Sequence, residues 1–177
     1  GVLVGQARQA RRLRHVPLTI DPSGGLTIAQ LSARARKQKR AGKTELIVVD
    51  YLQLLNGSRR DGRVNEVTEI TTGLKALAKE LSCCVIALSQ LNRQVESRPN
   101  KRPIMSDLRE SGSIEQDADV ILAPYRDEYY NADSHFQGLA ELLVLKNRQG
   151  ASGGFVPMSF QGEYTALGSI FGEWPEE

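Results

Sequence analysis

The sequence has 177 residues, which fits a single domain, and 40% of them are hydrophobic, enough to form a buried core. The formal net charge of +2 is too small to identify a nucleic-acid partner by itself. No stretch approaches the ~20 apolar residues of a membrane-spanning helix, and the start at Gly1 shows no signal-peptide core. We therefore expect a cytoplasmic protein without a membrane partner, and a chain that begins at an internal point of a longer protein.

The first quarter of the chain is predicted to contain two helices and one short strand. Residues 1–15 are basic and rich in Ala, Arg and Leu, which favours a helix. Residues 17–20 predict a short strand before a turn at 21–25. Thr27 fits the first position of a capping box, so a second helix should begin there and end near Gly42. Its basic side chains indicate a solvated face, and a subunit interface is the alternative.

Three apolar runs, at 46–49, 85–88 and 120–123, predict strands that are buried on both faces, as in a parallel sheet. Between the first two runs, apolar residues recur at steps of three and four and predict a helix that ends near Leu81. Residues 91–112 are polar and predict a long loop.

Residues 142–145 and 155–160 are expected to form an antiparallel pair, and residues 161–164 a turn into a last strand. Together these elements predict an α/β fold with a largely parallel sheet flanked by helices and with antiparallel strands at its C-terminal end.

The two cysteines, Cys83 and Cys84, are adjacent, so a disulfide between them would be strained. Both lie in an apolar run, and we expect free, buried thiols, as suits a reducing compartment.

Asp50 is the first candidate for chemistry, because it directly follows an apolar strand. Ligands of open parallel sheets bind at the carboxyl ends of the strands. A carboxylate at that position can hold Mg²⁺ through the water shell of the ion in a nucleoside triphosphatase. The same pattern is equally typical of a strand end that only caps a loop.

Five ordered segments resemble the DnaB family of replicative DNA helicases, and the resemblance runs from about residue 17 to residue 164. The segments are Asp50–Leu54, which is similar to a Walker B strand, Ala87–Arg93, Lys101–Asp119, Tyr125–Tyr130 and Lys146–Gly150. The resemblance implies a RecA-like core that hydrolyses ATP with Mg²⁺ and moves along single-stranded DNA to unwind the duplex at the replication fork. It also implies a homo-hexamer, with primase and a helicase loader as candidate partners.

The resemblance assigns roles around the nucleotide. Asp50 would hold Mg²⁺, and Gln90 would sense the γ-phosphate and link it to the DNA loop; a polar strand-end cap is the plain alternative for Gln90. Lys146 and Arg148 are two residues apart on a strand, so both side chains should point to one face. In the family these positions reach the nucleotide of the adjacent subunit, with Arg148 as the arginine finger. An ordinary exposed strand face is the alternative.

The resemblance implies that Arg109, Glu110 and Gly112 line a central channel and follow the backbone of single-stranded DNA without reading bases. Gly112 also fits an ordinary helix cap, and both descriptions can hold. Residues 150–154 are looser than the usual Gly-Pro turn of the family, which leaves the direction of Arg148 open.

The sequence contains no complete phosphate-binding loop. Gly42-Lys43-Thr44 looks like the tail of one, but Lys37 occupies the position that requires Gly, and a helix precedes the segment where a strand should. We therefore expect residues 1–177 to form a partial RecA-like helicase ATPase domain, without its N-terminal part and inactive alone. The alternatives are a RecA-like recombinase or loader ATPase, and a non-catalytic remnant that binds DNA or a helicase ring.

Overall fold

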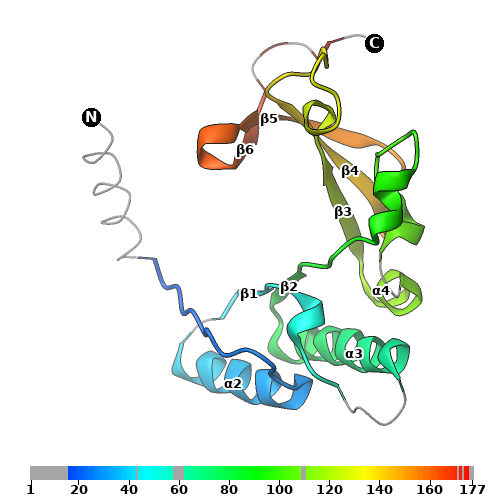
Figure 1. Ribbon diagram of the computed structural model, residues 1–177. Helices are drawn as coiled ribbons and strands as arrows, with labels where there is room; N and C mark the ends of the chain where they lie inside the picture. The colour runs from blue at the N-terminus through cyan, green and yellow to red at the C-terminus, as the bar shows by residue number, and fades with distance from the viewer. Residues whose placement is uncertain are drawn as a thin grey trace.

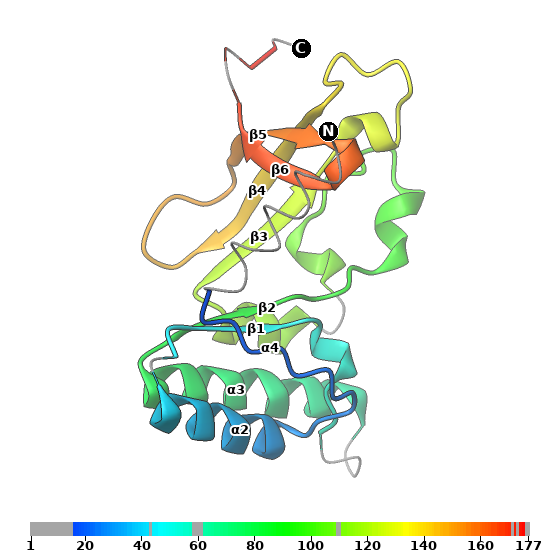
Figure 2. The ribbon, with the colours of Figure 1, turned by 90° about the vertical axis from the view of Figure 1, so that its left-hand side faces the viewer.

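The computed structural model describes residues 16–42, 44–57, 62–108, 111–170, 172 and 174–175, so the helix expected over residues 1–15 lies outside the described residues. Helices α2 and α3 lie beneath two short strands, and a separate sheet rises above them (Figures 1 and 2). The elements are α2 (Ile28–Ala41), β1 (Leu46–Val49), η1 (Leu52–Leu54), α3 (Arg63–Leu81), β2 (Cys84–Ala87), η2 (Arg93–Ser97), η3 (Met105–Asp107), α4 (Ser111–Asp117), β3 (Val120–Tyr125), η4 (Asp127–Tyr129), β4 (Leu139–Asn147), β5 (Phe155–Gln161), η5 (Gly162–Tyr164) and β6 (Ala166–Ser169).

Helices α2 and α3 cover one face of the parallel pair β1–β2. The periodic apolar residues of α3 are all buried, and those near its middle pack with Val49 and Leu52 in the main core. Gly73 lets α2 approach α3 closely, because a Cβ at this position would collide with Cγ1 of Ile28. The predicted capping box at Thr27 is confirmed, and α2 ends at Gly42, whose N–H donates to the carbonyl oxygen of Gln38. Both helices thus follow the local sequence signals.

The opposite face of β1 and β2 is uncovered among the described residues. Leu46 and Val48 of β1 are 51% and 57% exposed, and Ile86 of β2 is 49% exposed. These side chains share one face, because the register pairs Val48 with Ile86 and side chains alternate along a strand. The prediction that these strands are buried on both faces is therefore wrong for the described part of the chain. An exposed apolar strip of this kind indicates a surface that another segment covers.

The third apolar run forms β3, which belongs to a different sheet. Strands β3–β4–β5–β6 form a four-stranded antiparallel sheet, while β1 and β2 form the parallel one. The expectation of a largely parallel sheet is therefore wrong for the described residues, because β3 pairs antiparallel with β4. The antiparallel pairing of β4 with β5 and the turn into β6 are confirmed.

Three smaller expectations need correction. Residues 17–20 form no strand, since Leu18 and Ile20 are 62% and 77% exposed and pair with no strand of the described chain. The long loop over 91–112 contains the short helices η2 and η3 and the beginning of α4. Both cysteines are free as expected, but Cys84 is exposed on the uncovered face of β2. No helix in the described ranges is long and apolar enough to cross a membrane.

Candidate functional site

Asp50 and Gln90 both lie in segments that leave the parallel pair at its carboxyl edge. The register places Val49 opposite Ala87, so the chain leaves both strands at the same edge. A hydrogen bond from the N–H of Leu88 to the carbonyl oxygen of Val49, 2.9 Å long, extends the pairing past the end of β2. Both Asp50 and Gln90 are exposed. This edge is where a sheet of this type presents polar groups to a ligand.

Gln53 joins the two strand ends through its side-chain amide. Its Nε2 donates to the hydroxyl of Ser89 at 3.1 Å, and its Oε1 accepts from the backbone N–H of Gln90 at 3.3 Å. Gln53 lies in η1, three residues after Asp50. The amide therefore fixes the backbone at Gln90 relative to the segment that carries Asp50.

The donor set at this edge decides which kind of metal site it could form. Among the described residues, no group of three or more His, Cys, Asp and Glu side chains could surround a metal ion. Asp50 is a single exposed carboxylate. Mg²⁺ keeps most of its waters and binds through one or two carboxylates together with phosphate oxygens. A single carboxylate at this edge is compatible with a hydrated Mg²⁺ that a nucleotide would also have to hold.

Lys146 and Arg148 form a second group, against the C-terminal end of α4. Nζ of Lys146 donates to the carbonyl oxygen of Ala118 at 2.8 Å, and also to that of Glu115. Nη2 of Arg148 donates to the carbonyl oxygen of Gln116 at 2.9 Å. Both cations thus contact the same helix end, but Arg148 lies in the turn just after β4, so the expectation that both residues lie on one strand is wrong. Carbonyl groups at a helix end lack partners within the helix, so cations stabilise them.

Asp119 connects this second group to α3. Its carboxylate accepts from Nη1 of Arg148 at 3.0 Å and also from Nζ of Lys75. The hydrogen bond from Lys75, helped by the positive charges of Arg148 and Lys146, holds the pKa of Asp119 below its usual range. The carboxylate therefore stays charged at neutral pH and remains paired with Lys75 and Arg148.

Of the expected DNA-contacting residues, Gly112 lies in the first turn of α4, while Arg109 and Glu110 lie outside the described residues. Gly112 is exposed, and a Cβ added there would meet nothing within 4 Å. Local packing therefore does not require glycine at this position.

An ion pair fixes the chain just before the expected DNA loop. Arg98 donates to both carboxylate oxygens of Asp107, at 3.0 and 2.7 Å, and Asp107 is only 4% exposed. The carbonyl oxygen of Asp107 accepts from the N–H of Asn92 at 2.7 Å, and Leu91 forms a bridge with Leu108. The chain that follows Gln90 is thus hydrogen-bonded to the chain that precedes residue 109.

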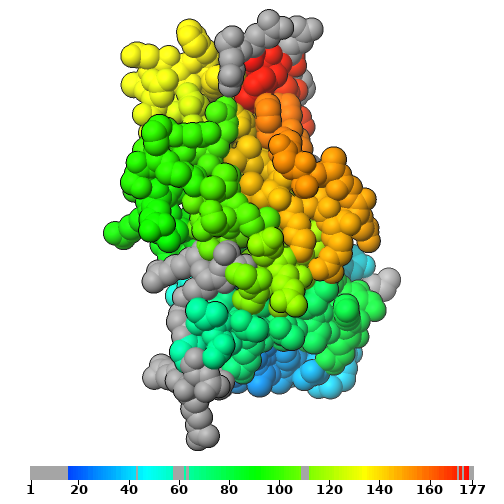
Figure 3. Space-filling model, turned by 90° about the vertical axis from the view of Figure 1, so that its right-hand side faces the viewer, coloured from blue at the N-terminus to red at the C-terminus, as the bar shows by residue number. Residues whose placement is uncertain are grey.

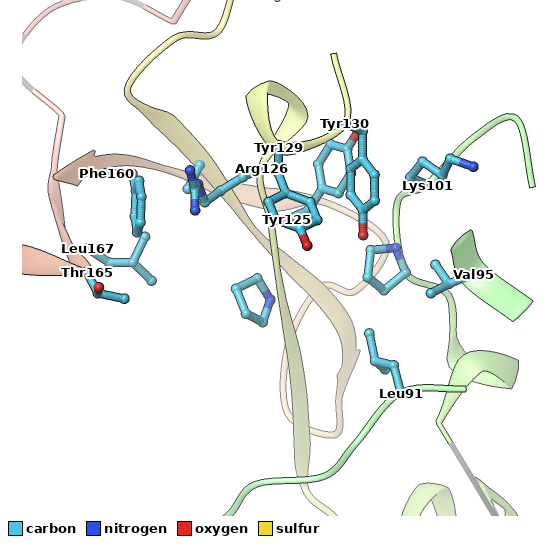
Figure 4. A pocket seen from close by; sticks show the side chains of 13 residues that line it. Leu91, Val95, Lys101, Tyr125, Arg126, Tyr129, Tyr130, Phe160, Thr165 and Leu167 are labelled. Atoms are coloured by element: carbon cyan, nitrogen blue, oxygen red, sulfur yellow. The ribbon is translucent and has the colours of Figure 1, made fainter. Parts of the chain in front are cut away.

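A cavity of about 340 Å³ lies between the β3–β4 region and the segment that follows Gln90. Tyr125, Tyr129 and Tyr130 surround it, and Arg126 lies across the ring of Phe160 with its Cζ 3.6 Å from the ring centroid (Figure 4). Its lining includes none of the residues expected at a nucleotide or DNA site.

Three residues that tie these groups together were not found from the sequence: Gln53, Asp107 and Asp119. All three lie inside the segments that carry the family resemblance, yet no local pattern indicates their hydrogen-bond partners. Asp119 is hydrogen-bonded to Arg148, which is 29 residues away in the sequence, and Gln53 is hydrogen-bonded to Gln90, which is 37 residues away. Only the tertiary structure identifies such pairs, because no short-range spacing encodes them.

Most of the chain is similar to known replicative helicases. The model of the family described as DnaB-like helicase C terminal domain matches residues 4–169. The replicative DNA helicase DnaB of Pasteurella multocida is 52% identical over 155 residues, which cover 86% of this chain and 33% of that protein. The corresponding helicase of Geobacillus stearothermophilus is 47% identical, with coverage of 86% and 34%. The chain thus spans about a third of the length of these curated relatives.

Two solved structures have a similar fold. One, described as the structure of a DnaB-like replicative helicase and its interactions with primase, has a TM-score of 0.88 and 38% identity; the match covers 93% of this chain and 40% of that one. The other, described as an ATPase domain, has a TM-score of 0.78 and 41% identity, with coverage of 83% and 52%. Both contain substantial further chain beyond the matched region.

Proposed function

The chain belongs to the DnaB-like helicase C-terminal domain family, and on this basis we propose that it is the distal part of an ATP-driven DNA-translocating motor. In the proposed assembly, six copies of the full-length protein form a ring around single-stranded DNA, and primase and a helicase loader are its candidate partners. The observation that supports the proposal is the shared edge at which β1 and β2 end, with Asp50 and Gln90 in the segments that follow these strands. The family match favours a helicase over a recombinase or a loader ATPase.

The uncovered apolar face of β1 and β2 supports the view that residues 1–177 are part of a larger domain. Leu46, Val48 and Ile86 are each about half exposed on it. Burial of this strip would gain free energy at about 25 cal/mol per Å² of apolar surface removed from water. The rest of the motor domain, which would carry the phosphate-binding loop and the carboxylate that activates water, is the proposed cover.

At the nucleotide, Asp50 would orient a Mg²⁺ through its water shell, and the ion would neutralise charge on the transferred phosphoryl group. Gln90, with its backbone fixed by Gln53, would place its side-chain amide toward the γ-phosphate. Loss of the γ-phosphate would remove a hydrogen-bond partner of Gln90. The bonds from Leu91 and Asn92 to the chain before residue 109 would carry that change to the DNA loop.

Lys146 and Arg148 are proposed to act on the nucleotide of the adjacent subunit. The two cations lie side by side at the end of α4 and share the contacts of that helix end. A planar, permanently charged guanidinium stabilises the charge of a phosphoryl-transfer transition state. Arg109, Glu110 and Gly112 are proposed to follow the DNA backbone, which makes binding independent of base sequence.

The test of a trans-acting finger uses mixed rings of the full-length helicase. Rings of Arg148→Ala subunits should lose about a thousandfold or more of their ATP turnover, the usual magnitude for an arginine finger. When these subunits are mixed with subunits that lack a working phosphate-binding loop, some interfaces combine an intact loop with an intact Arg148. ATP turnover should therefore return on mixing two inactive proteins.

The matched control is Lys79→Ala, which removes an exposed cation from the last turn of α3 and should leave turnover unchanged. Mixed assembly is verified by mass spectrometry of rings with differently tagged subunits. If verified mixed rings stay inactive, Arg148 does not act across the interface.

A further inference from the structure

Asp119 holds Arg148 at the backbone and at the side chain together. The N–H of Arg148 donates to the carbonyl oxygen of Asp119 at 2.8 Å, and Nη1 of Arg148 donates to its carboxylate at 3.0 Å. Nη2 is held at the same time by the carbonyl oxygen of Gln116. A planar guanidinium that is bound through both terminal nitrogens has a fixed direction. Since guanidinium has five N–H donors, donors remain free for a phosphate.

Helix α4, which carries these contacts, is itself firmly attached to α3. Asp117 accepts from the hydroxyls of Thr71 and Thr72 at 2.7 and 3.1 Å, and Ile114 is 8% exposed in the main core. Figure 3 shows α4 between α3 and the turn that joins β4 to β5. The helix is one short unit, with Gly112 in its first turn and the partners of Arg148 at its end. A displacement at one end therefore moves the other.

We propose that Asp119 is a positioning residue for Arg148, and that through α4 it links the DNA-contacting segment of a subunit to the finger that the same subunit extends to its neighbour. The inference rests on the proposed function, in which Arg148 acts on an adjacent nucleotide. In this scheme, DNA bound at Gly112 determines the position of α4. The position of α4 determines where the carboxylate of Asp119 lies, and this carboxylate orients the guanidinium of Arg148. Asp119 does not touch the nucleotide in this scheme.

Lys75 provides a way to separate this role from simple packing. Asp119 binds Lys75 of α3 as well as Arg148, so Asp119→Asn weakens both contacts, whereas Lys75→Gln removes only the contact to α3. If Asp119 acts through Arg148, the two variants must differ. If it merely fastens α4 to α3, they must behave alike.

The experiment measures ATP turnover of the full-length helicase with and without single-stranded poly-dT. Asp119→Asn should lower the DNA-stimulated kcat roughly tenfold or more, while KM for ATP stays within about twofold, because a misplaced group costs rate rather than ground-state binding. Asp119→Glu, which keeps the carboxylate, should recover part of the loss, and Lys75→Gln should resemble the wild type. The melting temperature should be the same for all of them.

Arg148→Ala is measured in parallel, so that the two hypotheses fail separately. An inactive Arg148→Ala ring together with a fully active Asp119→Asn ring would overturn only the positioning role of Asp119. An active Arg148→Ala ring would overturn the proposed function of Arg148 itself. Equal losses in Asp119→Asn and Lys75→Gln, or a loss that follows a lowered melting temperature, would assign Asp119 to packing and overturn the inference.

Discussion

Replacing Arg98 with methionine should destabilise the segment that leads into the DNA loop. The change keeps an unbranched apolar stem but removes the guanidinium that binds both carboxylate oxygens of Asp107, at 3.0 and 2.7 Å. It also removes a hydrogen bond of 3.0 Å to the carbonyl oxygen of Arg102. The side chain of Asp107 is 5% exposed, so its charge would stay buried. Among the described residues, the one donor left to its carboxylate would be the backbone N–H of Ile104, 2.8 Å away.

The cost follows from the burial of the two partners. Removing one partner of a buried ion pair costs about 3–5 kcal/mol, because the other charge stays uncompensated. The side chain of Arg98 is 31% exposed, so solvent screens part of the interaction, and we expect about 3 kcal/mol. For a domain of roughly 150–250 residues, that corresponds to a fall in melting temperature of roughly 6–12 °C, and the larger full-length protein should show a fall near or below the lower end of this range.

The assay is thermal unfolding of the full-length helicase by calorimetry, with single-strand affinity measured beside it. Combining Arg98→Met with Asp107→Asn removes the uncompensated charge, so the double variant should be less destabilised than the sum of the single variants. Arg36→Met breaks a bidentate pair with Glu80 whose partners are both 45% exposed, and should leave the melting temperature unchanged. A fall of less than about 2 °C for Arg98→Met, or strict additivity, would refute the reasoning.

Three further predictions concern DNA, acid and hydrolysis. Gly112→Val should weaken binding of the full-length ring to poly-dT and to mixed-sequence DNA equally, with nucleotide affinity unchanged; a loss confined to one base composition would contradict backbone recognition. Hydrogen bonds from the N–H of Gly138 and from the guanidinium of Arg126 lower the pKa of Glu128. Glu128 therefore stabilises the fold above about pH 4, and this contribution disappears as pH falls through the lowered pKa. Glu128→Gln should therefore make the melting temperature fall less steeply at low pH. An unchanged fall would show that other carboxylates dominate the loss of stability in acid. The isolated chain should not hydrolyse ATP, and turnover that Asp50→Ala abolishes would contradict this.

Elements with local signals could be predicted from the sequence. Helix α3 follows from apolar residues at steps of three and four, and α2 begins at Thr27 because its capping box involves only neighbouring residues. Strands β4 and β5 pair as expected because a short connection favours antiparallel neighbours. The family was also accessible from sequence, since several ordered segments resemble one family and the family model matches residues 4–169.

The division of the strands into sheets, and the faces that are covered, depend on contacts between distant parts of the chain. The apolar run at 120–123 looks the same in a parallel or an antiparallel sheet, and only its pairing with β4 distinguishes them. The run at 46–49 indicates two apolar faces, but helices of the described residues cover only one. The sequence of a strand shows that its faces are apolar. It does not show whether the segment that covers each face belongs to the described residues.

The same limit applies to the candidate site. Asp50, Gln90, Lys146 and Arg148 were predicted from their segments, but their supporting partners Gln53 and Asp119 were not. A helix or strand depends mainly on contacts between residues close in the sequence, so the spacing of its apolar residues can be recognised in a short stretch. A hydrogen bond between groups 29 or 37 residues apart depends on how complete elements pack, which no short stretch of sequence contains.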